Sequence, residues 1–111
     1  MSDATIYFVA GERSGDNHGA ALLKALRARA PKMQFLGRGG PNMRTIAGGK
    51  FLDWIDDTAV VGLWEVIRRY PFFRKQFRAT ISEIEAARPS AVVLIDYPGF
   101  NLRLAHALRT K

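Results

Sequence analysis

Two short apolar runs constrain the fold of this chain more than any other feature. Residues 4–10 (ATIYFVA) and 91–96 (AVVLID) are rich in β-branched and other apolar residues, and neither alternates polar with apolar positions. The first run predicts a strand buried on both faces, which is typical of parallel sheets, and the second is the most strand-like segment of the chain. A polar loop containing glycine follows each run, so the ends of both strands are candidate ligand-binding positions.

The rest of the chain alternates helix and strand in the same way. After the first loop we expect an amphipathic helix ending near Pro31, a strand at 33–37, a short helix at 39–49, a strand at 50–54, a long helix at 62–87 interrupted at Pro71, and a last helix through Leu108. This order predicts right-handed crossovers and an α/β fold, a Rossmann-like parallel sheet with helices on both faces. One domain spans residues 1–111.

Composition excludes several classes of protein. The chain is 48% hydrophobic and 24% charged, which excludes disorder, and it has no cysteine and therefore no disulfide or thiol chemistry. No apolar run approaches the roughly 18 to 20 residues needed to cross a bilayer, and we see no signal peptide, so we expect a cytoplasmic location. The net charge is +7, and residues 61–111 carry nine basic and four acidic side chains. This excess favours an anionic partner.

The first loop, VAGERSGDNHG at 9–19, matches no common phosphate-binding or nucleophile motif. It lacks the G-x-G-x-x-G spacing, the Gly-Lys-Ser/Thr of a P-loop and the G-x-S-x-G elbow. Its glycines and a following helix N-terminus still offer backbone N–H groups to an anion, with Ser14 or Asp16 as a helix cap. A tight turn and cap without any ligand explains the same residues, and both interpretations stay open.

Asp96 is a carboxylate at the end of an apolar strand, before a Tyr-Pro-Gly sequence. A general base can be held in such a position. Equally, Asp96 can cap the next turn or helix, a role for which Asn101 is also suited. Two histidines do not indicate a metal site, and we interpret Asp53, Asp56 and Asp57 as a solvated acidic loop. We therefore expect neither a metal nor a cofactor.

Residues 60–78 allow two interpretations. On a helical wheel Val60, Leu63, Trp64, Val66, Ile67 and Tyr70 form a wide apolar arc, and 68–78 has five cations, no anion and four aromatics. Exposed in part, this segment suits contact with an anionic membrane surface. Alternatively, the arc is core and the cations form a solvated face. Beyond Pro71, the stripe Phe73, Phe77, Ile81 and Ile84 has helical spacing and is expected to be core.

Taken together, the motifs resemble the N-terminal part of the lipid-A-disaccharide synthase family of bacterial glycosyltransferases. VAGERSGDNHGAALLKAL is similar to the family's V-A-G-E-x-S-G-D-x-x-G-A-x-L-x-x-A-L, and FLGRGGPNM to its F-x-G-x-x-G-P-x-M. AVVGLWEVIRRYP resembles A-V-M-G-x-x-E-V-L-x-x-x-x, and PSAVVLIDYPGFNLRLA resembles P-D-x-x-x-x-I-D-x-P-x-F-N-x-x-L. Four motifs in family order are far more specific than any one alone.

The resemblance implies a peripheral membrane enzyme of the two-Rossmann-domain (GT-B) type. Such an enzyme joins UDP-2,3-diacylglucosamine to 2,3-diacylglucosamine 1-phosphate, releases UDP and makes a β-1,6-linked precursor of lipid A at the inner membrane. It implies a base for the acceptor 6-hydroxyl, and Asp96 matches the family's essential aspartate. The family's C-terminal donor half, with its UDP-binding motifs, has no counterpart here, so we expect this chain alone to be inactive.

The resemblance also implies a set of site residues. Those expected to contact the substrate are Gly11, Glu12, Ser14, Gly15, Asp16, Pro98 and Asn101, and those expected to contact the membrane are Leu63, Trp64, Ile67, Arg68 and Tyr70. Expected partners are the UDP-sugar donor, the acylated glucosamine phosphate acceptor and an anionic membrane surface, with no nucleic acid. A non-catalytic Rossmann-like module that binds acyl-sugar phosphate or membrane is the rival hypothesis.

If the segment around Trp64 contacts lipid, replacing Trp64 and Ile67 together by Glu should weaken membrane binding, because two charges would have to enter the headgroup and acyl boundary. Co-sedimentation with vesicles that contain anionic phospholipid measures the effect, and we expect a loss of several-fold. Equal binding of the two proteins would contradict the membrane assignment.

Overall fold

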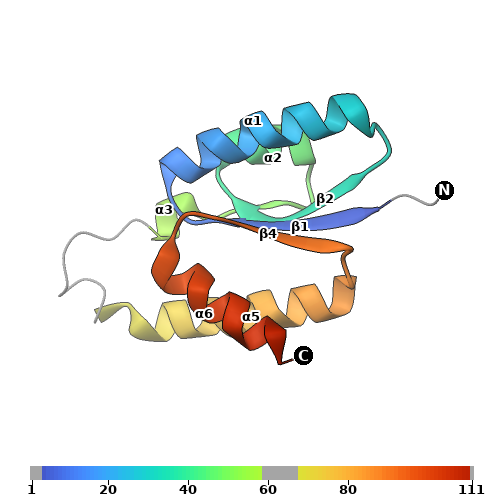
Figure 1. Cartoon of the computed structure of the whole chain (residues 1–111). Helices are drawn as coiled ribbons and strands as arrows, with labels where there is room; N and C mark the ends of the chain where they lie inside the picture. The colour runs from blue at the N-terminus through green and yellow to red at the C-terminus, as the bar shows by residue number, and fades with distance from the viewer. Residues whose placement is uncertain (1–3, 59–67, 111) are drawn as a thin grey trace.

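The computed structural model describes residues 4–58 and 68–110 and has two helical layers around one sheet. Its elements are β1 (Thr5–Ala10), α1 (Arg13–Arg29), β2 (Gln34–Gly39), α2 (Pro41–Ala47), β3 (Leu52–Asp53), α3 (Ile55–Thr58), α5 (Tyr70–Ala87), β4 (Ala91–Ile95) and α6 (Pro98–Arg109). The strands are parallel in the order β3-β2-β1-β4. Helices α1 and α2 cover one face of the sheet, and α5 and α6 cover the other (Figure 1). The predicted Rossmann-like α/β fold is confirmed.

Strand β1 is one of the two inner strands of the sheet and is buried on both faces, as its composition predicts. Its side chains alternate between two apolar clusters, because successive residues of a strand point to opposite faces. Toward α1 and α2 the buried cluster is Phe8, Ala10, Leu23, Phe35, Met43 and Phe51. Toward α5 and α6 it is Tyr7, Val9, Trp54, Ile84 and Leu104. Each helical layer therefore has a core of its own.

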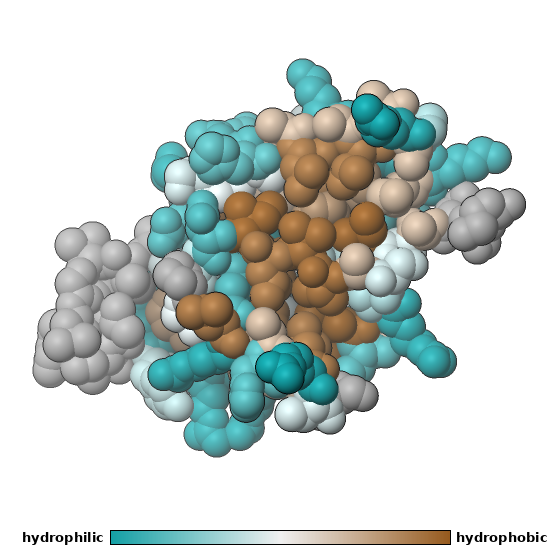
Figure 2. Space-filling model, viewed as in Figure 1, coloured by the Kyte–Doolittle hydropathy of each residue, from teal (hydrophilic) through white to brown (hydrophobic). Residues whose placement is uncertain are grey.

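Strand β4 pairs only with β1 within the described sheet, and its side chains from Val92 to Ile95 are partly buried. Figure 2, drawn in the view of Figure 1, shows hydrophobic residues gathered across the middle of the molecule, between the two helical layers where β4 lies. This edge of the sheet is the least covered part of the apolar interior in that view.

Several expected boundaries are wrong. The loop predicted at 9–19 is mostly the first turns of α1, in which Gly15 and Gly19 are helical and buried. Glycine is a poor helix former, by about 1 kcal/mol relative to alanine, so the pattern predicted a loop. Close packing explains the residue instead, because a Cβ on Gly19 would lie 2.5 Å from Met43 Sδ of α2.

Other departures are smaller. Strand β3 is two residues long rather than five, and Asp56 lies in the short helix α3 rather than in a loop. Pro71 is the second residue of α5, so it begins a helix rather than interrupting one, as a proline without an N–H can. Residues 62–67 of the predicted long helix lie outside the described residues. Similarly, Pro98 and Gly99 form the first turn of α6.

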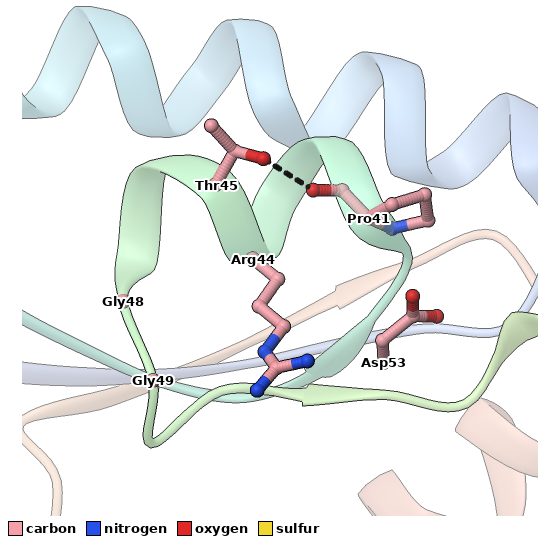
Figure 3. Close-up of a pocket in the computed structure, with 6 residues that line it drawn as sticks. All are labelled: Pro41, Arg44, Thr45, Gly48, Gly49 and Asp53. Atoms are coloured by element: carbon pink, nitrogen blue, oxygen red, sulfur yellow. Dashed lines mark hydrogen bonds between the residues drawn. The ribbon is translucent and has the colours of Figure 1, made fainter.

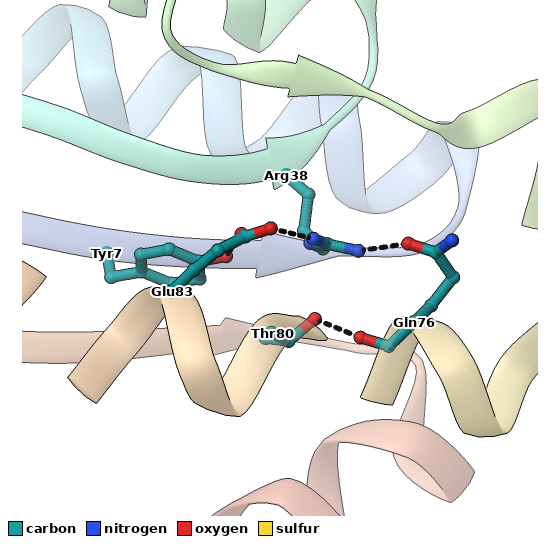
Figure 4. A network of polar contacts seen from close by, with 5 residues as sticks. All are labelled: Tyr7, Arg38, Gln76, Thr80 and Glu83. Atoms are coloured by element: carbon teal, nitrogen blue, oxygen red, sulfur yellow. Dashed lines mark hydrogen bonds and ion pairs between the residues drawn. The ribbon is translucent and has the colours of Figure 1, made fainter. Parts of the chain in front are cut away.

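One polar network crosses the interface between the sheet and α5 (Figure 4). Arg38, at the carboxyl end of β2, is only 1% exposed, and its Nη2 lies 2.6 Å from Glu83 Oε2. Its Nη1 donates to Gln76 Oε1 at 2.7 Å, and its guanidinium stacks 4.8 Å from the Trp54 ring. The Tyr7 hydroxyl donates to the other oxygen of Glu83. Burial, then this hydrogen bond, raises the pKa of Tyr7 above its usual value.

Replacing Glu83 by Ala should destabilise the fold, because the buried charge of Arg38 would lose its counter-ion. Loss of one partner of a buried pair costs about 3 to 5 kcal/mol, and we expect about 2 to 3 kcal/mol here because Glu83 is nearly half exposed. Urea unfolding measures the change. Ser82→Ala, at the exposed neighbouring position of α5, is the control and should stay within about 0.5 kcal/mol. Equal midpoints for the two variants would contradict the role of the pair.

Candidate functional site

The candidate site lies where β1 and β4 end. The two strands are parallel neighbours with Ala10 opposite Ile95, so the segments that follow them leave the same edge of the sheet. Gly11 follows β1, and Asp96 and Tyr97 follow β4. A Cβ on Gly11 would lie 2.2 Å from the Tyr97 ring, so Tyr97 packs directly against the backbone of the first segment. The two predicted site segments are therefore in contact.

Asp96 and Tyr97 have an unusual backbone. Their φ angles are 50° and 53°, in the left-handed region that side chains other than glycine rarely adopt. Each such residue costs about 1 to 3 kcal/mol and persists only where the surroundings hold it. Here the backbone turns sharply between β4 and α6, and the Asp96 side chain is left exposed to solvent.

Asn101 holds this turn from inside the protein. It is 4% exposed, and its Nδ2 lies 2.6 Å from the Asp96 carbonyl oxygen, to which it donates. The same nitrogen lies 3.4 Å from the carbonyl oxygens of Val9, in β1, and of Ile95, in β4. Asn101 therefore positions Asp96, whereas the sequence predicted a contact with substrate. Its Oδ1 is buried and has no partner among the described residues.

The Asp96 carboxylate makes no hydrogen bond or ion pair with any other residue in the described ranges 4–58 and 68–110. The helix cap proposed for it is not formed, because α6 has Tyr97 at its N-cap position and no side-chain cap bond. Pro98, one of the predicted substrate contacts, is the first residue of α6. The carboxylate is thus available to a ligand.

Helix α1 begins at the same edge of the sheet. Its N-cap residue is Glu12, again without a side-chain cap bond, and Ser14 is exposed in its first turn. Neither Ser14 nor Asp16 caps α1 as predicted. The first N–H groups of a helix carry a partial positive charge and lack helical partners, so two helix starts at one edge favour an anionic ligand. Gly15 is buried beneath these helix starts, and a Cβ built on it would make only ordinary van der Waals contacts with Ala10 and Ile95.

Asp16 is engaged inside the protein. It is 2% exposed, and its carboxylate accepts hydrogen bonds from the backbone N–H groups of Gly40 and Met43 through Oδ1 and of Asn42 through Oδ2, at 2.9 to 3.0 Å. It caps α2 from the neighbouring helix. Since both oxygens are used in this way, the contact predicted between Asp16 and substrate is not part of our proposal.

Sequence reasoning missed three side chains that build this edge. Trp54 Nε1 donates to the Ala10 carbonyl at 2.7 Å, and Thr58 Oγ1 donates to the Gly11 carbonyl at 2.7 Å. Tyr97 is the third. Its burial, and then the negative charge of Glu12, raise its pKa to about 12. A buried tryptophan needs an acceptor for its N–H, which was the available signal for Trp54.

A separate hollow of about 390 Å³ lies beside α2. Figure 3 shows its lining, in which Thr45 Oγ1 donates to the Pro41 carbonyl at 2.9 Å and Asp53 and Arg44 supply the charges. Among the residues that the structure describes, no group of three or more His, Cys, Asp or Glu side chains could hold a metal ion. In the same residues, no helix is both long and apolar enough to cross a membrane.

The predicted membrane-contact residues fall in two groups. Leu63, Trp64 and Ile67 lie outside the described residues. Arg68 and Tyr70 are exposed, and 56% of the Tyr70 surface is accessible. The adjacent Arg69 stacks on Phe72 and Phe73, with its guanidinium carbon 4.6 and 5.7 Å from the ring centres.

Comparison with known proteins gives a consistent result. The family model for lipid-A-disaccharide synthetase matches residues 6–111. The lipid-A-disaccharide synthase of Granulibacter bethesdensis is 44% identical over 109 residues, which cover 98% of this chain and 28% of the relative. The corresponding protein of Trichlorobacter lovleyi is 44% identical over 89% of the chain, and synthase 1 of Legionella pneumophila (strain Lens) is 40% identical over 96%. The chain spans about a quarter of the length of these relatives.

Replacing Asp16 by Ala should destabilise the protein, because three backbone N–H groups near the start of α2 would lose their acceptor. An unsatisfied buried donor costs about 1 to 3 kcal/mol, and we expect a total loss of about 3 kcal/mol because water can reach part of this helix end. Urea unfolding measures the loss. Ser14→Ala, at an exposed position of the same helical turn, is the matched control. Equal stability of the two variants would show that Asp16 does not clamp α2.

Proposed function

The chain belongs to the lipid-A-disaccharide synthetase family, and from this premise we propose that it forms the acceptor side of a glycosyltransferase active site. The reaction we propose joins UDP-2,3-diacylglucosamine to 2,3-diacylglucosamine 1-phosphate in lipid A biosynthesis. The chain spans about a quarter of the length of these relatives, and we assign no donor-binding site to its residues.

Asp96 carries the proposal. In an inverting transfer, the acceptor 6-hydroxyl attacks the anomeric carbon of the donor, UDP leaves, and a base takes the hydroxyl proton. A base for this step must be open to substrate and must be held in position. The Asp96 carboxylate is exposed and unpaired within the described residues, while Asn101 and the Tyr97–Gly11 contact hold its backbone. These features support Asp96 as the base or as a charge close to the reacting hydroxyl.

Glu12 and Ser14 complete the proposed acceptor side. Both side chains are exposed at the start of α1, at the same edge as Asp96. Hydroxyl and carboxylate groups can bind the hydroxyls of a sugar acceptor. Gly11, Gly15 and Asn101 support this edge from within, since all three are buried. We assign them to positioning rather than to substrate contact.

We also propose that the protein acts as a peripheral enzyme on the cytoplasmic face of the inner membrane. The cations of 68–78 and the exposed ring of Tyr70 support contact with anionic headgroups, because basic and aromatic side chains favour the membrane interface. The acylated substrates would be met there.

A chimeric enzyme tests the proposal. This chain replaces the matched segment of the Granulibacter bethesdensis relative, and formation of the disaccharide from the two acylated substrates is measured. We expect transfer by the chimera and a loss of about 10² to 10⁴-fold in Asp96→Asn, the usual contribution of a general base. Asp56→Asn, at a side chain that is 95% exposed, is the control and should keep full activity.

The outcomes separate the hypotheses. A folded Asp96→Asn chimera that retains turnover would remove Asp96 from the mechanism. A folded chimera that binds the acceptor without any transfer would instead favour the non-catalytic binding module.

A further inference from the structure

An apolar groove of about 670 Å³ runs between α5 and the beginning of α6. Its volume lies within the range of roughly 300 to 1,000 Å³ that is usual for small-molecule sites. It shares no lining residue with the hollow beside α2 (Figure 3). Helices α5 and α6, which supply most of its lining, cover the opposite face of the sheet from α2 (Figure 1). Nothing in the reaction proposed above uses it.

Aromatic rings form the floor of the groove. Phe77 of α5 meets Phe100 of α6 edge to face at 5.5 Å between ring centres, and Tyr97 stacks on Phe100 at 5.8 Å. Trp54, in the core beneath, contacts Phe100 at 5.3 Å. Because each ring is held by its neighbours, the floor is preformed and would accept an apolar ligand without rearrangement.

Three arginines line the same groove. Arg74 and Arg78 come from α5 and Arg103 comes from α6, and all three are exposed. Within the described residues none of them forms an ion pair, whereas Arg13 and Arg38 do. Unpaired guanidinium groups beside an apolar floor are complementary to an anion attached to an alkyl chain, since arginine binds phosphate oxygens in pairs.

The groove and the candidate site share Tyr97. Tyr97 lines the groove and directly follows Asp96, so a ligand on the floor lies beside the turn that carries the carboxylate. Phe73, expected from its helical spacing to be core, also lines the groove and is absent from both buried clusters. Gly99 leaves the wall open, because a Cβ built on it meets no atom within 4 Å.

We propose that this groove binds an acyl chain of the acceptor on its aromatic floor, with the phosphate of the same molecule held by Arg74, Arg78 and Arg103. The inference rests on the proposed function for the identity of the ligand. The apolar floor and the three arginines of the groove suit an anionic amphiphile. In the proposed reaction, the acylated sugar phosphate acceptor is an anionic amphiphile that binds beside Asp96.

Blocking the groove tests the proposal. Gly99→Trp places a large ring where the backbone leaves room, and Arg74→Glu/Arg103→Glu reverses the charge at exposed positions. Calorimetric titration of this chain with dodecyl phosphate, below its micelle concentration, measures binding of the shared chemistry. We expect each variant to lose about tenfold or more in affinity, because Gly99→Trp fills the space for the alkyl chain and the charge reversal removes charge-assisted hydrogen bonds to the phosphate. Arg29→Glu, at an exposed position of α1 on the other face, is the control.

Each outcome decides a separate point. Equal affinity of the wild type and both folded variants for dodecyl phosphate would overturn the proposal that the groove is the binding site. Glucosamine 1-phosphate, which lacks a chain, should bind much more weakly, and equal binding would overturn the role of the aromatic floor. Thermal unfolding verifies that the Gly99→Trp variant is folded. If that variant is unfolded, the affinity of the Arg74→Glu/Arg103→Glu variant alone tests the groove.

The identity of the ligand needs a second measurement in the chimeric enzyme. There Gly99→Trp should raise KM for the acylated acceptor and leave KM for the UDP-sugar unchanged. An unchanged acceptor KM, together with weaker binding of the Gly99→Trp chain to phosphatidylglycerol vesicles, would assign the groove to a membrane lipid and overturn the proposal. Failure of the chimera to transfer at all counts against the proposed function, and the titration then decides the groove by itself.

Discussion

The burial of one positive charge governs how the two halves of this fold meet. Arg38 leaves β2 on the face covered by α5, where water cannot reach it, and its two Nη groups donate to Gln76 and Glu83, while its Nε has no partner among the described residues. A buried charge without such partners would cost several kcal/mol, so α5 can pack on the sheet only in the register that brings Gln76 and Glu83 to the guanidinium. That register also sets the positions of Phe77 and Arg78, which directly follow Gln76 in the same helix. The floor of the groove therefore depends on an ion pair that touches no ligand.

The edge of the sheet that carries Asp96 follows a related logic. Two consecutive left-handed residues are unfavourable, and they persist because the Asn101 amide binds the Asp96 carbonyl and because Gly11 leaves room for the Tyr97 ring. The polar groups that could have stabilised the carboxylate are directed at backbone atoms instead. The protein thus uses its buried side chains to fix a backbone and leaves the acidic group itself to the solvent.

Much of the fold could be predicted from local pattern. The run around Phe8 predicts a buried strand, because hydrophobicity without alternation requires two covered faces. The run around Val93 predicts a strand as well, and the alternation of helix and strand predicts the parallel order. The position of Asp96 at a strand end was visible for the same reason. The extent of α1 was not visible, because the cost of Gly15 and Gly19 in a helix is offset by contacts with other elements that a local pattern does not contain. The roles of Asp16 and Arg38 depend on partners 24 to 45 residues away in the sequence, and sequence patterns predict only contacts between residues a few positions apart.

Strand β4 has a further consequence, for the behaviour of the chain in solution. Among the described residues β4 has a neighbouring strand on one side only, and an unpaired strand edge is a template on which a second strand can pair, including the same strand of another copy. The net charge of +7 opposes such encounters by repulsion between copies. Salt weakens that repulsion, since the screening length is about 10 Å at 0.1 M, while it leaves the apolar attraction intact. The tendency of copies of this chain to associate through the edge of β4 therefore increases with ionic strength.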